Sequence, residues 1–174
     1  MIQDIIIVYI NYQGQANTIL AGIDNKTIWT KTAIVSERIP LISDLTIEEN
    51  ISLVYDYVHN DRLKNALVDA LKLCDEFDLT SSLRKYPHEL SLKQTLIAKF
   101  IRAIAVKPNV IAFIQPHRML LSEEYSEFID LLKKIKNQKI AIIENKNYKG
   151  DYFELDITEV DYKEWQTHII QNSD

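Results

Sequence analysis

Histidine, cysteine and serine are among the residue types in this sequence that could bind a metal ion or act as a nucleophile. The four histidines are scattered, without metal-ligand spacing or a cysteine cluster: His59, His88, His117 and His168. The single cysteine, Cys74, lies in an amphipathic helical pattern, where an unpaired cysteine is most often a small buried residue. Counting alone does not rule out a Ser-His-Asp triad, yet no serine has a nucleophile-elbow context. We therefore expect no metal and no cofactor, and surface or packing roles for the histidines.

The charge balance argues against a broad nucleic-acid surface. The 174 residues include 20 Lys and Arg against 25 Asp and Glu, a formal net charge of -5. Nucleic acid would therefore need a local basic patch. The apolar run from Ile5 to Ile10 is too short to span a bilayer and lacks the flanks of a signal peptide. We expect a cytoplasmic protein that binds no nucleic acid and does not insert directly into a membrane.

Apolar runs and capping signals predict an α/β domain. Buried strands of a parallel sheet are predicted at residues 5–10, 32–36, 110–114 and 140–143. Helices are predicted over residues 46–58, 61–76, 91–106 and 122–136. The alternating stretches 152–156 and 165–170 are candidates for edge strands. Because two successive helices interrupt the strand–helix alternation, we expect one domain over residues 1–174 with an inserted helical subdomain at about 44–106.

Two capping boxes mark where helices begin. Thr46 with Glu49, and Ser91 with Gln94, have the spacing in which a hydroxyl and a longer polar side chain satisfy free amides of the first turn. The structural interpretation of Ser91 and Gln94 is thus a helix cap.

Two stretches, residues 44–51 and 86–94, resemble the helical subdomain and the signature motif of ATP-binding-cassette (ABC) ATPases. The signature usually reads Tyr-Pro-x-Glu-Leu-Ser-Gly-Gly-Gln, followed by a helix with Ala-Arg-Ala-Leu, a proline and a buried strand. Here the order is Tyr86-Pro87-His88-Glu89-Leu90-Ser91-Leu92-Lys93-Gln94, then Ile101-Arg102-Ala103-Ile104-Ala105, Pro108 and the strand at 110–114. The resemblance covers residues 33–145 and implies a P-loop NTPase-like core. The alternative is an unrelated α/β domain whose capped helices mimic the pattern.

The family's antiparallel β subdomain is expected to be truncated. Only about ten residues, 22–31, separate the first predicted helix from the second strand, and the chain begins at the strand that feeds the phosphate loop. The resemblance thus implies that a base-stacking platform for the nucleotide is missing.

The expected phosphate-binding loop lacks the family's chemistry. A P-loop needs glycines that let backbone amides approach phosphates, a lysine for the β and γ charges, and a hydroxyl for Mg²⁺. If Thr18 begins the following helix, Ala16 falls at the lysine position and Asn17 at the hydroxyl position. Gly14 is the one remaining glycine and is typical of an ordinary strand-to-helix turn.

The resemblance places unsuitable residues at the other nucleotide positions as well. Ile114 corresponds to the metal-linked aspartate of Walker B, and Gln115 corresponds to the catalytic glutamate. An amide cannot act as a general base. Glu37 corresponds to the Q-loop glutamine, where its charge would repel a triphosphate, and Asn145 corresponds to the switch histidine.

The signature motif is altered on the surface that normally faces a partner's nucleotide. Leu90, Ser91 and Gln94 are kept, whereas Leu92 and Lys93 replace the two glycines. Lys93 is interpreted as a solvated residue of the first helical turn, or as a charge offered to a partner's nucleotide.

The resemblance implies a non-catalytic, pseudo-ATPase subunit of a membrane transport complex. Its expected partners are a permease and/or an intact ABC ATPase at the inner membrane face, with dimer formation possible in principle and bacterial lipid transport as the expected cargo class. The expected docking anchors are Ile39, Leu41, Tyr55 and Tyr57. For the apolar residues of 39–42, burial in the core is an equal alternative. The alternatives are a weak ATP-binding or ATPase subunit that completes a composite site, and a free-standing regulatory or scaffold protein.

Overall fold

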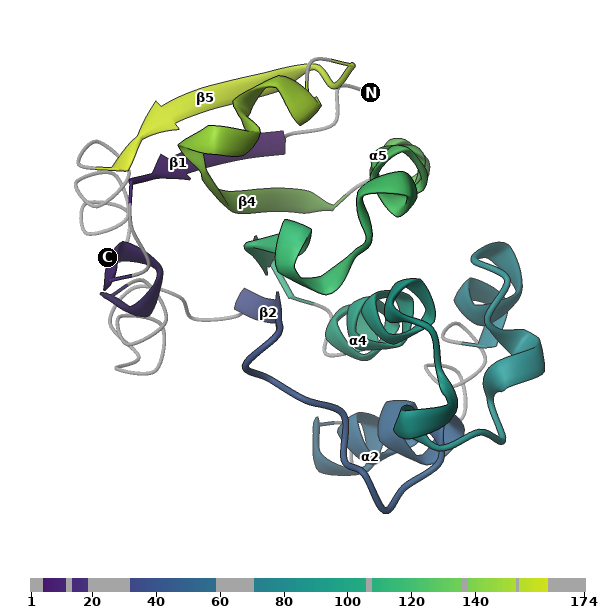
Figure 1. The fold of residues 1–174 in the computed structure, drawn as a ribbon. Helices are drawn as coiled ribbons and strands as arrows, with labels where there is room; N and C mark the ends of the chain where they lie inside the picture. Colours follow the sequence, from purple (N-terminus) through teal and green to yellow (C-terminus); the bar gives the residue numbers. More distant parts are fainter. Residues whose placement is uncertain are drawn as a thin grey trace.

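A five-stranded parallel sheet forms the centre of the protein. The computed structural model describes residues 5–11, 14–18, 32–58, 71–105, 108–135, 138–152 and 154–162. In this part of the chain the strands are β1 (Ile5–Ile10), β2 (Thr32–Ser36), β3 (Val110–Ile114), β4 (Lys139–Asn145) and β5 (Ile157–Asp161). Their order is β2-β3-β4-β1-β5, and every neighbouring pair is parallel (Figure 1). The predicted α/β fold with a parallel sheet is confirmed.

The last strand of the described residues lies later in the chain than the alternation suggested. Tyr152 ends a 3-10 segment, η5 (Lys146–Tyr152), and β5 begins only at Ile157. The prediction of a strand over 152–156 is therefore wrong. Tyr152 and Leu155 are buried in the main core cluster, so their apolar character reflects an anchored turn. The predicted strand over 165–170 lies outside the described residues.

Three longer helices form close to their predicted positions: α2 (Ile47–Val58), α4 (Leu92–Ala105) and α5 (Tyr125–Lys134). Both capping boxes are present: Glu49 N donates to Thr46 Oγ1 at 3.3 Å, and Gln94 N donates to Ser91 Oγ at 3.1 Å. Residues 122–124, predicted as the start of α5, instead form the short 3-10 helix η4 (Ser122–Glu124). Residues 71–76 are helical as predicted, and the earlier part of that predicted helix, 61–70, lies outside the described residues.

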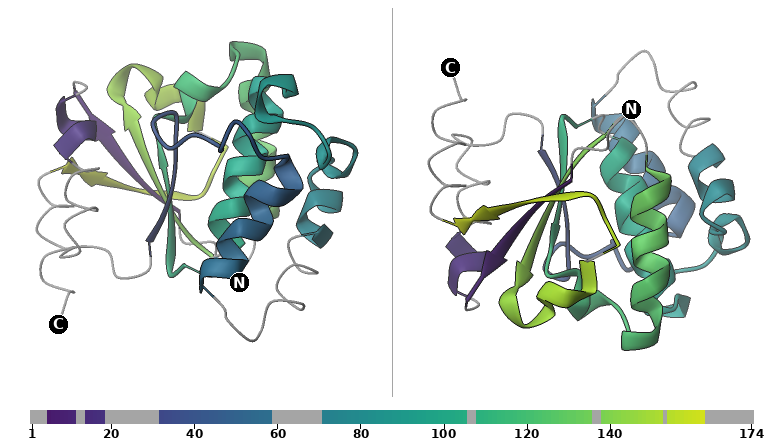
Figure 2. Two further views of the ribbon diagram at one scale, coloured as in Figure 1. Left: turned by 90° about the horizontal axis from the view of Figure 1, so that it is seen from below. Right: turned by 90° about the horizontal axis from the view of Figure 1, so that it is seen from above.

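Alternating strand residues supply two apolar clusters on the two faces of the sheet. Ile7 and Phe113 belong to the larger cluster, whereas their neighbours Val8 and Ile114 belong to the smaller one. This arrangement explains the continuous apolar strand sequences, because a parallel sheet is covered on both faces. Helices α2, α4 and α5 lie together on one side of the sheet (Figure 2), and the larger cluster includes residues from all three.

The parallel sheet brings the ends of separate strands to one edge. The carboxyl ends of β1, β2, β3 and β4 are followed by residues 11, 37, 115 and 146, respectively. Ligands of open parallel α/β sheets bind outside this edge. The predicted nucleotide positions follow β1 and β2 or lie at the ends of β3 and β4, and they therefore converge at this edge.

Candidate functional site

Residues 14–18 form a helical turn after β1, and its Gln15 and Thr18 side chains form hydrogen bonds within the chain. Thr18 Oγ1 donates to Gly14 O at 3.0 Å, and the backbone N of Asn11 donates to Gln15 Oε1 at 2.7 Å. The methyl group of Ala16 is fully buried in the smaller apolar cluster. This turn therefore packs against the sheet and supplies neither a lysine nor a free Thr18 hydroxyl donor for a phosphate.

The end of β3 also lacks groups that suit a magnesium nucleotide. Ile114 packs in the smaller apolar cluster, and Gln115 is buried with a left-handed backbone, φ 50° and ψ 59°. The backbone N of Gln115 donates to Ile143 O at 2.8 Å. An aliphatic side chain and a neutral amide neither neutralise phosphate nor supply a carboxylate for Mg²⁺. Ile114 and Gln115 therefore supply neither a positive charge nor a carboxylate at the end of β3.

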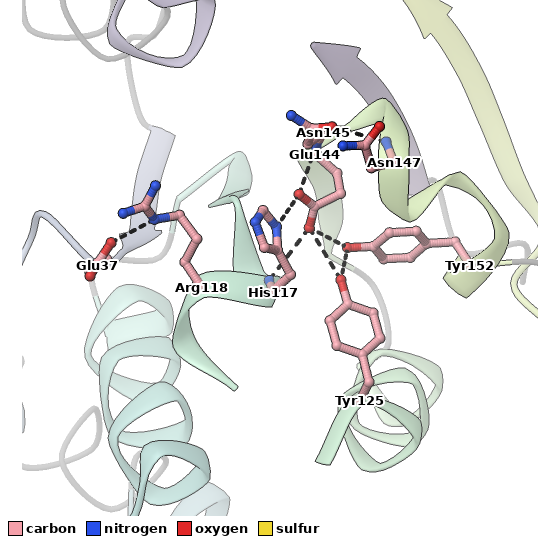
Figure 3. A network of polar contacts seen from close by, with 8 residues as sticks. All are labelled: Glu37, His117, Arg118, Tyr125, Glu144, Asn145, Asn147 and Tyr152. Atoms are coloured by element: carbon pink, nitrogen blue, oxygen red, sulfur yellow. Dashed lines mark hydrogen bonds and ion pairs between the residues drawn. The ribbon is translucent and has the colours of Figure 1, made fainter. Parts of the chain in front are cut away.

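Glu37, the predicted Q-loop position, forms an ion pair across the sheet edge. Its Oε2 lies 2.8 Å from Nε of Arg118 in η3 (Pro116–Met119), and both side chains are about half exposed (Figure 3). Exposed ion pairs contribute at most about 1 kcal/mol. The contact nevertheless links the end of β2 directly to the segment that follows β3.

Two buried or half-buried cations fix the loop that follows β2. Lys99 Nζ donates to Ser36 O at 2.9 Å, and Arg102 Nη1 donates to Pro40 O at 2.9 Å. Burial lowers the pKa of Lys99, with the neighbouring Arg102 charge adding to the effect. Arg102 of helix α4 thus holds the loop of residues 37–46, which we name the Q-side loop, and Lys99 holds the residue of β2 directly before it.

Asn50 closes the same loop from α2. Its Nδ2 donates to the carbonyl oxygens of Ile42, Leu45 and Thr46 at 3.0, 3.1 and 3.0 Å. Its Oδ1 accepts from Ile42 N at 2.7 Å, and its side chain is buried. Buried polar groups that are fully hydrogen-bonded specify a single conformation. The Q-side loop is therefore fixed by contacts of the chain itself.

The predicted docking anchors are only partly on the surface. Ile39 is exposed, but Leu41 is 6% exposed and packs in the larger apolar cluster. Leu41 as an anchor is therefore corrected, because its side chain fills the core beneath the loop. Ile42, 44% exposed, is the outward apolar residue instead. The side chains of Tyr55 and Tyr57, predicted anchors in α2, lie outside the described part of the structure.

The signature-like segment forms a helix start. Ser91 and Gln94 cap α4, and Gln94 Nε2 also donates to Ser82 Oγ at 3.1 Å. Leu92 is exposed, and Leu90 is partly buried against the core. Lys93 forms an ion pair with Glu127 of α5. The side chain of Lys93 therefore has a partner within the chain, on the surface where a glycine is usual.

A buried carboxylate that sequence analysis did not identify lies at the end of β4. Glu144 is fully buried, and it interacts with His117, Tyr125, Tyr152 and the backbone N of Asn145 (Figure 3). The hydroxyls of Tyr152 and Tyr125 lie 3.1 and 3.2 Å from Glu144 Oε2. A buried carboxylate is tolerated when hydrogen-bond donors surround it. The network joins η3, α5, β4 and η5 at one point.

The tyrosine hydroxyls of this network stay protonated. Burial, together with the Glu144 charge, raises the pKa of Tyr125 and that of Tyr152 well above the ordinary tyrosine value. Their hydroxyl groups lie 2.5 Å apart. Asn145, at the predicted switch position, accepts from Asn147 N at 2.9 Å within η5. Its side-chain oxygen is therefore used to shape the turn.

A cavity of about 430 Å³ lies beside this network and is lined by His117, Leu120, Tyr125, Ile129, Tyr148 and Asp151, among others. The imidazole of His117 stacks on the Tyr148 ring with centroids 3.9 Å apart. The sequence predicts a surface or packing role for His117. The signal in the sequence that could have marked His117 as a site residue was its position directly after Pro116, close to the end of a predicted buried strand.

Within the described ranges, no three or more His, Cys, Asp or Glu side chains are arranged to hold a metal ion. The same ranges contain no helix that is both long and apolar enough to cross a membrane.

Relatives identified by sequence are ATP-binding proteins of bacterial transport systems. The glutamate transport ATP-binding protein of Corynebacterium efficiens is 25% identical over 122 residues, which is 70% of this chain and 50% of the relative. The glutamate/aspartate import ATP-binding protein of Escherichia coli K12 is 25% identical over 66% of this chain and 47% of its own length. A lipoprotein-releasing system ATP-binding protein of Chlorobium luteolum is 26% identical over 63% and 48%, respectively. The chain thus spans about half the length of the curated relatives it matches.

No protein-family model matches the sequence. Among solved structures, a chain of a metal-chelate type ABC transporter in an inward-facing conformation superposes with a TM-score of 0.69 at 16% identity. The match covers 93% of this chain and 69% of that one. The protein therefore has the fold of an ABC transporter chain, and its sequence relatives are ABC transporter ATP-binding proteins.

Proposed function

We propose that this protein is a non-catalytic subunit of an ABC-type transport complex that binds a permease and/or an intact ABC ATPase through its Q-side loop. One observation carries the proposal: this loop is fixed by the chain's own contacts, whereas Ala16, Ile114 and Gln115, at three of the expected nucleotide positions, are buried and uncharged. The proposed docking loop is thus ordered, although the expected lysine, aspartate and catalytic glutamate positions hold uncharged residues.

The absence of catalysis is inferred from what the edge residues can do. Ala16 and Ile114, at the expected lysine and Walker B aspartate positions, lie in the same apolar cluster. Installing either charge would bury an ion among aliphatic side chains, which costs several kcal/mol. Gln115, at the expected catalytic glutamate, offers no general base. These features favour a pseudo-ATPase.

The docking surface is inferred from rigidity and exposure together. Arg102 and Asn50 hold the backbone of the Q-side loop, and Ile39 and Ile42 are exposed on it. A preorganised loop binds without the entropic cost of ordering, and apolar anchors dominate the energy of ordinary interfaces. The loop therefore suits a protein partner.

The partner class follows from the relatives, whose names assign them to transport systems. We infer a cytoplasmic position at the inner membrane face, reached through these partners. Lipid transport remains a prediction: one relative is named for lipoprotein release, and others are named for amino-acid transport.

The composite-site alternative must offer a partner's nucleotide a surface on which Leu92 and Lys93 replace two glycines. The ion pair of Lys93 with Glu127 favours a role of this side chain within its own chain. An enzyme reconstituted from both subunits would distinguish the two: Lys93→Ala should leave the partner's ATPase rate unchanged.

Co-purification of the tagged protein from its own membranes tests the proposal. Wild type should retain a permease or an ABC ATPase, and Ile42→Asp should lose it while remaining folded. Leu121→Asp is the matched control, because Leu121 is 49% exposed, similar to the 44% of Ile42, and lies outside the loop. Two results would overturn the proposal in favour of a free-standing scaffold. Either the folded double variant Ile39→Asp, Ile42→Asp retains all partners, or the wild type retains no permease and no ABC ATPase.

A further inference from the structure

The cavity beside Glu144 has the size and lining of a small-molecule site. Its volume of about 430 Å³ falls within the range of such pockets, roughly 300–1,000 Å³. Leu120 and Ile129 give it an apolar part, and Tyr148 and His117 give it aromatic walls. We propose that this cavity binds a small organic cation, namely a primary amine carried on an aromatic or aliphatic body. This site is separate from the proposed docking loop.

The charges around the cavity select for a cation. Asp151 and Glu154 line it, whereas no Lys or Arg does so among the described residues. Lys133 lies 2.8 Å from Glu154 and balances that carboxylate. A protonated His117 would balance Glu144 in the same way. Asp151 has no ion-pair partner in the described ranges, so the cavity keeps at least one net negative charge in either protonation state of His117.

His117 and Tyr148 add a hydrogen-bond acceptor and an aromatic ring to the negative charge of the cavity. Glu144 holds Nδ1 of His117, and no hydrogen bond to Nε2 is present within the described residues. A neutral imidazole oriented in this way has Nε2 as an acceptor, which suits the N–H donors of an amine. The face of an aromatic ring attracts a cation as well. Acceptor, ring and carboxylate thus point to the same ligand class.

Titration of the whole protein with tyramine, followed by two-dimensional amide NMR, tests this inference. Saturable shifts are expected at residues 148 and 151, with a dissociation constant on the order of 1 mM for a ligand of this size. The acid of similar shape, 4-hydroxyphenylacetate, should bind at least about fivefold more weakly, because its charge is reversed.

Matched variants separate the cavity from general charge effects. Asp151→Asn should weaken tyramine binding about two- to fivefold, and Asp75→Asn, an equal charge change on an exposed helical residue, should not. Tyr148→Leu should weaken binding by removing the ring face. Absence of saturable shifts at 148 and 151, equal binding of the acid, or equal weakening by Asp75→Asn would overturn the inference.

Discussion

Asn50→Ala would remove the side chain that closes the Q-side loop. Asn50 makes four hydrogen bonds, with N···O distances from 2.7 to 3.1 Å, and it is buried at 1% exposure. A hydrogen bond of this kind contributes about 0.5–1.5 kcal/mol net, and three donated bonds share one amide group. We therefore expect the free energy of unfolding to fall by about 2–4 kcal/mol, out of a typical total of about 5–15 kcal/mol.

Urea unfolding measures this loss, and hydrogen exchange localises it. The amide of Ile42, which donates to Asn50 Oδ1, should exchange faster in Asn50→Ala than in wild type. Ser52→Ala is the control, because it removes one side-chain bond to Glu48 O from a partly exposed position of the same helix. It should change the free energy of unfolding by less than about 0.5 kcal/mol. A loss under about 1 kcal/mol for Asn50→Ala, with unchanged exchange at Ile42, would refute the view that this side chain fixes the loop.

The other predictions concern the buried network, the sheet edge and the first capping box. Glu144→Ala should lower the free energy of unfolding by about 3–5 kcal/mol in denaturant titrations, since it leaves His117, Tyr125 and Tyr152 without their acceptor; a loss under about 1 kcal/mol would contradict the assigned network. Ala16→Lys should destabilise the fold in thermal melts, because Ala16 is fully buried. It should give no ATP turnover, because Gln115 still offers no general base; turnover in that variant would contradict the assignment of this edge as non-catalytic. The hydrogen bond from Thr46 N to the Glu49 carboxylate lowers the pKa of Glu49 below the ordinary value of 4.5. The ionised Glu49 therefore stabilises the folded state above pH 4.5, and this stabilisation is lost as the pH falls through the lower folded-state pKa. Glu49→Gln should therefore flatten the decline of unfolding free energy between about pH 5 and 3, and an unchanged slope would contradict the assignment.

The strands and the long helices were predictable because their signals are local. The uninterrupted apolar run of β1 and the Ser91–Gln94 cap of α4 depend on neighbours within a few residues. Errors occurred where a long-range contact decides the structure. Tyr152 belongs to a turn instead of a strand, because its hydroxyl binds Glu144 and its ring fills the core.

The candidate site was harder to predict, because its partners are distant in the chain. His117 and Glu144 are 27 positions apart, and they meet only because β3 and β4 are adjacent and parallel. No spacing rule pairs these residues. Leu41 and Ile42 show the same difficulty at a loop, where no helical or strand period indicates which of two consecutive apolar side chains faces the core.

Calorimetric titration of the purified protein with Mg-ATP tests most directly the claim that this is a non-catalytic member of a transport complex. We expect no saturable heat at millimolar nucleotide, because buried Ala16 and Ile114 and the neutral Gln115 supply no charge for the phosphates or the metal. A saturable isotherm with a dissociation constant in the micromolar range would contradict it.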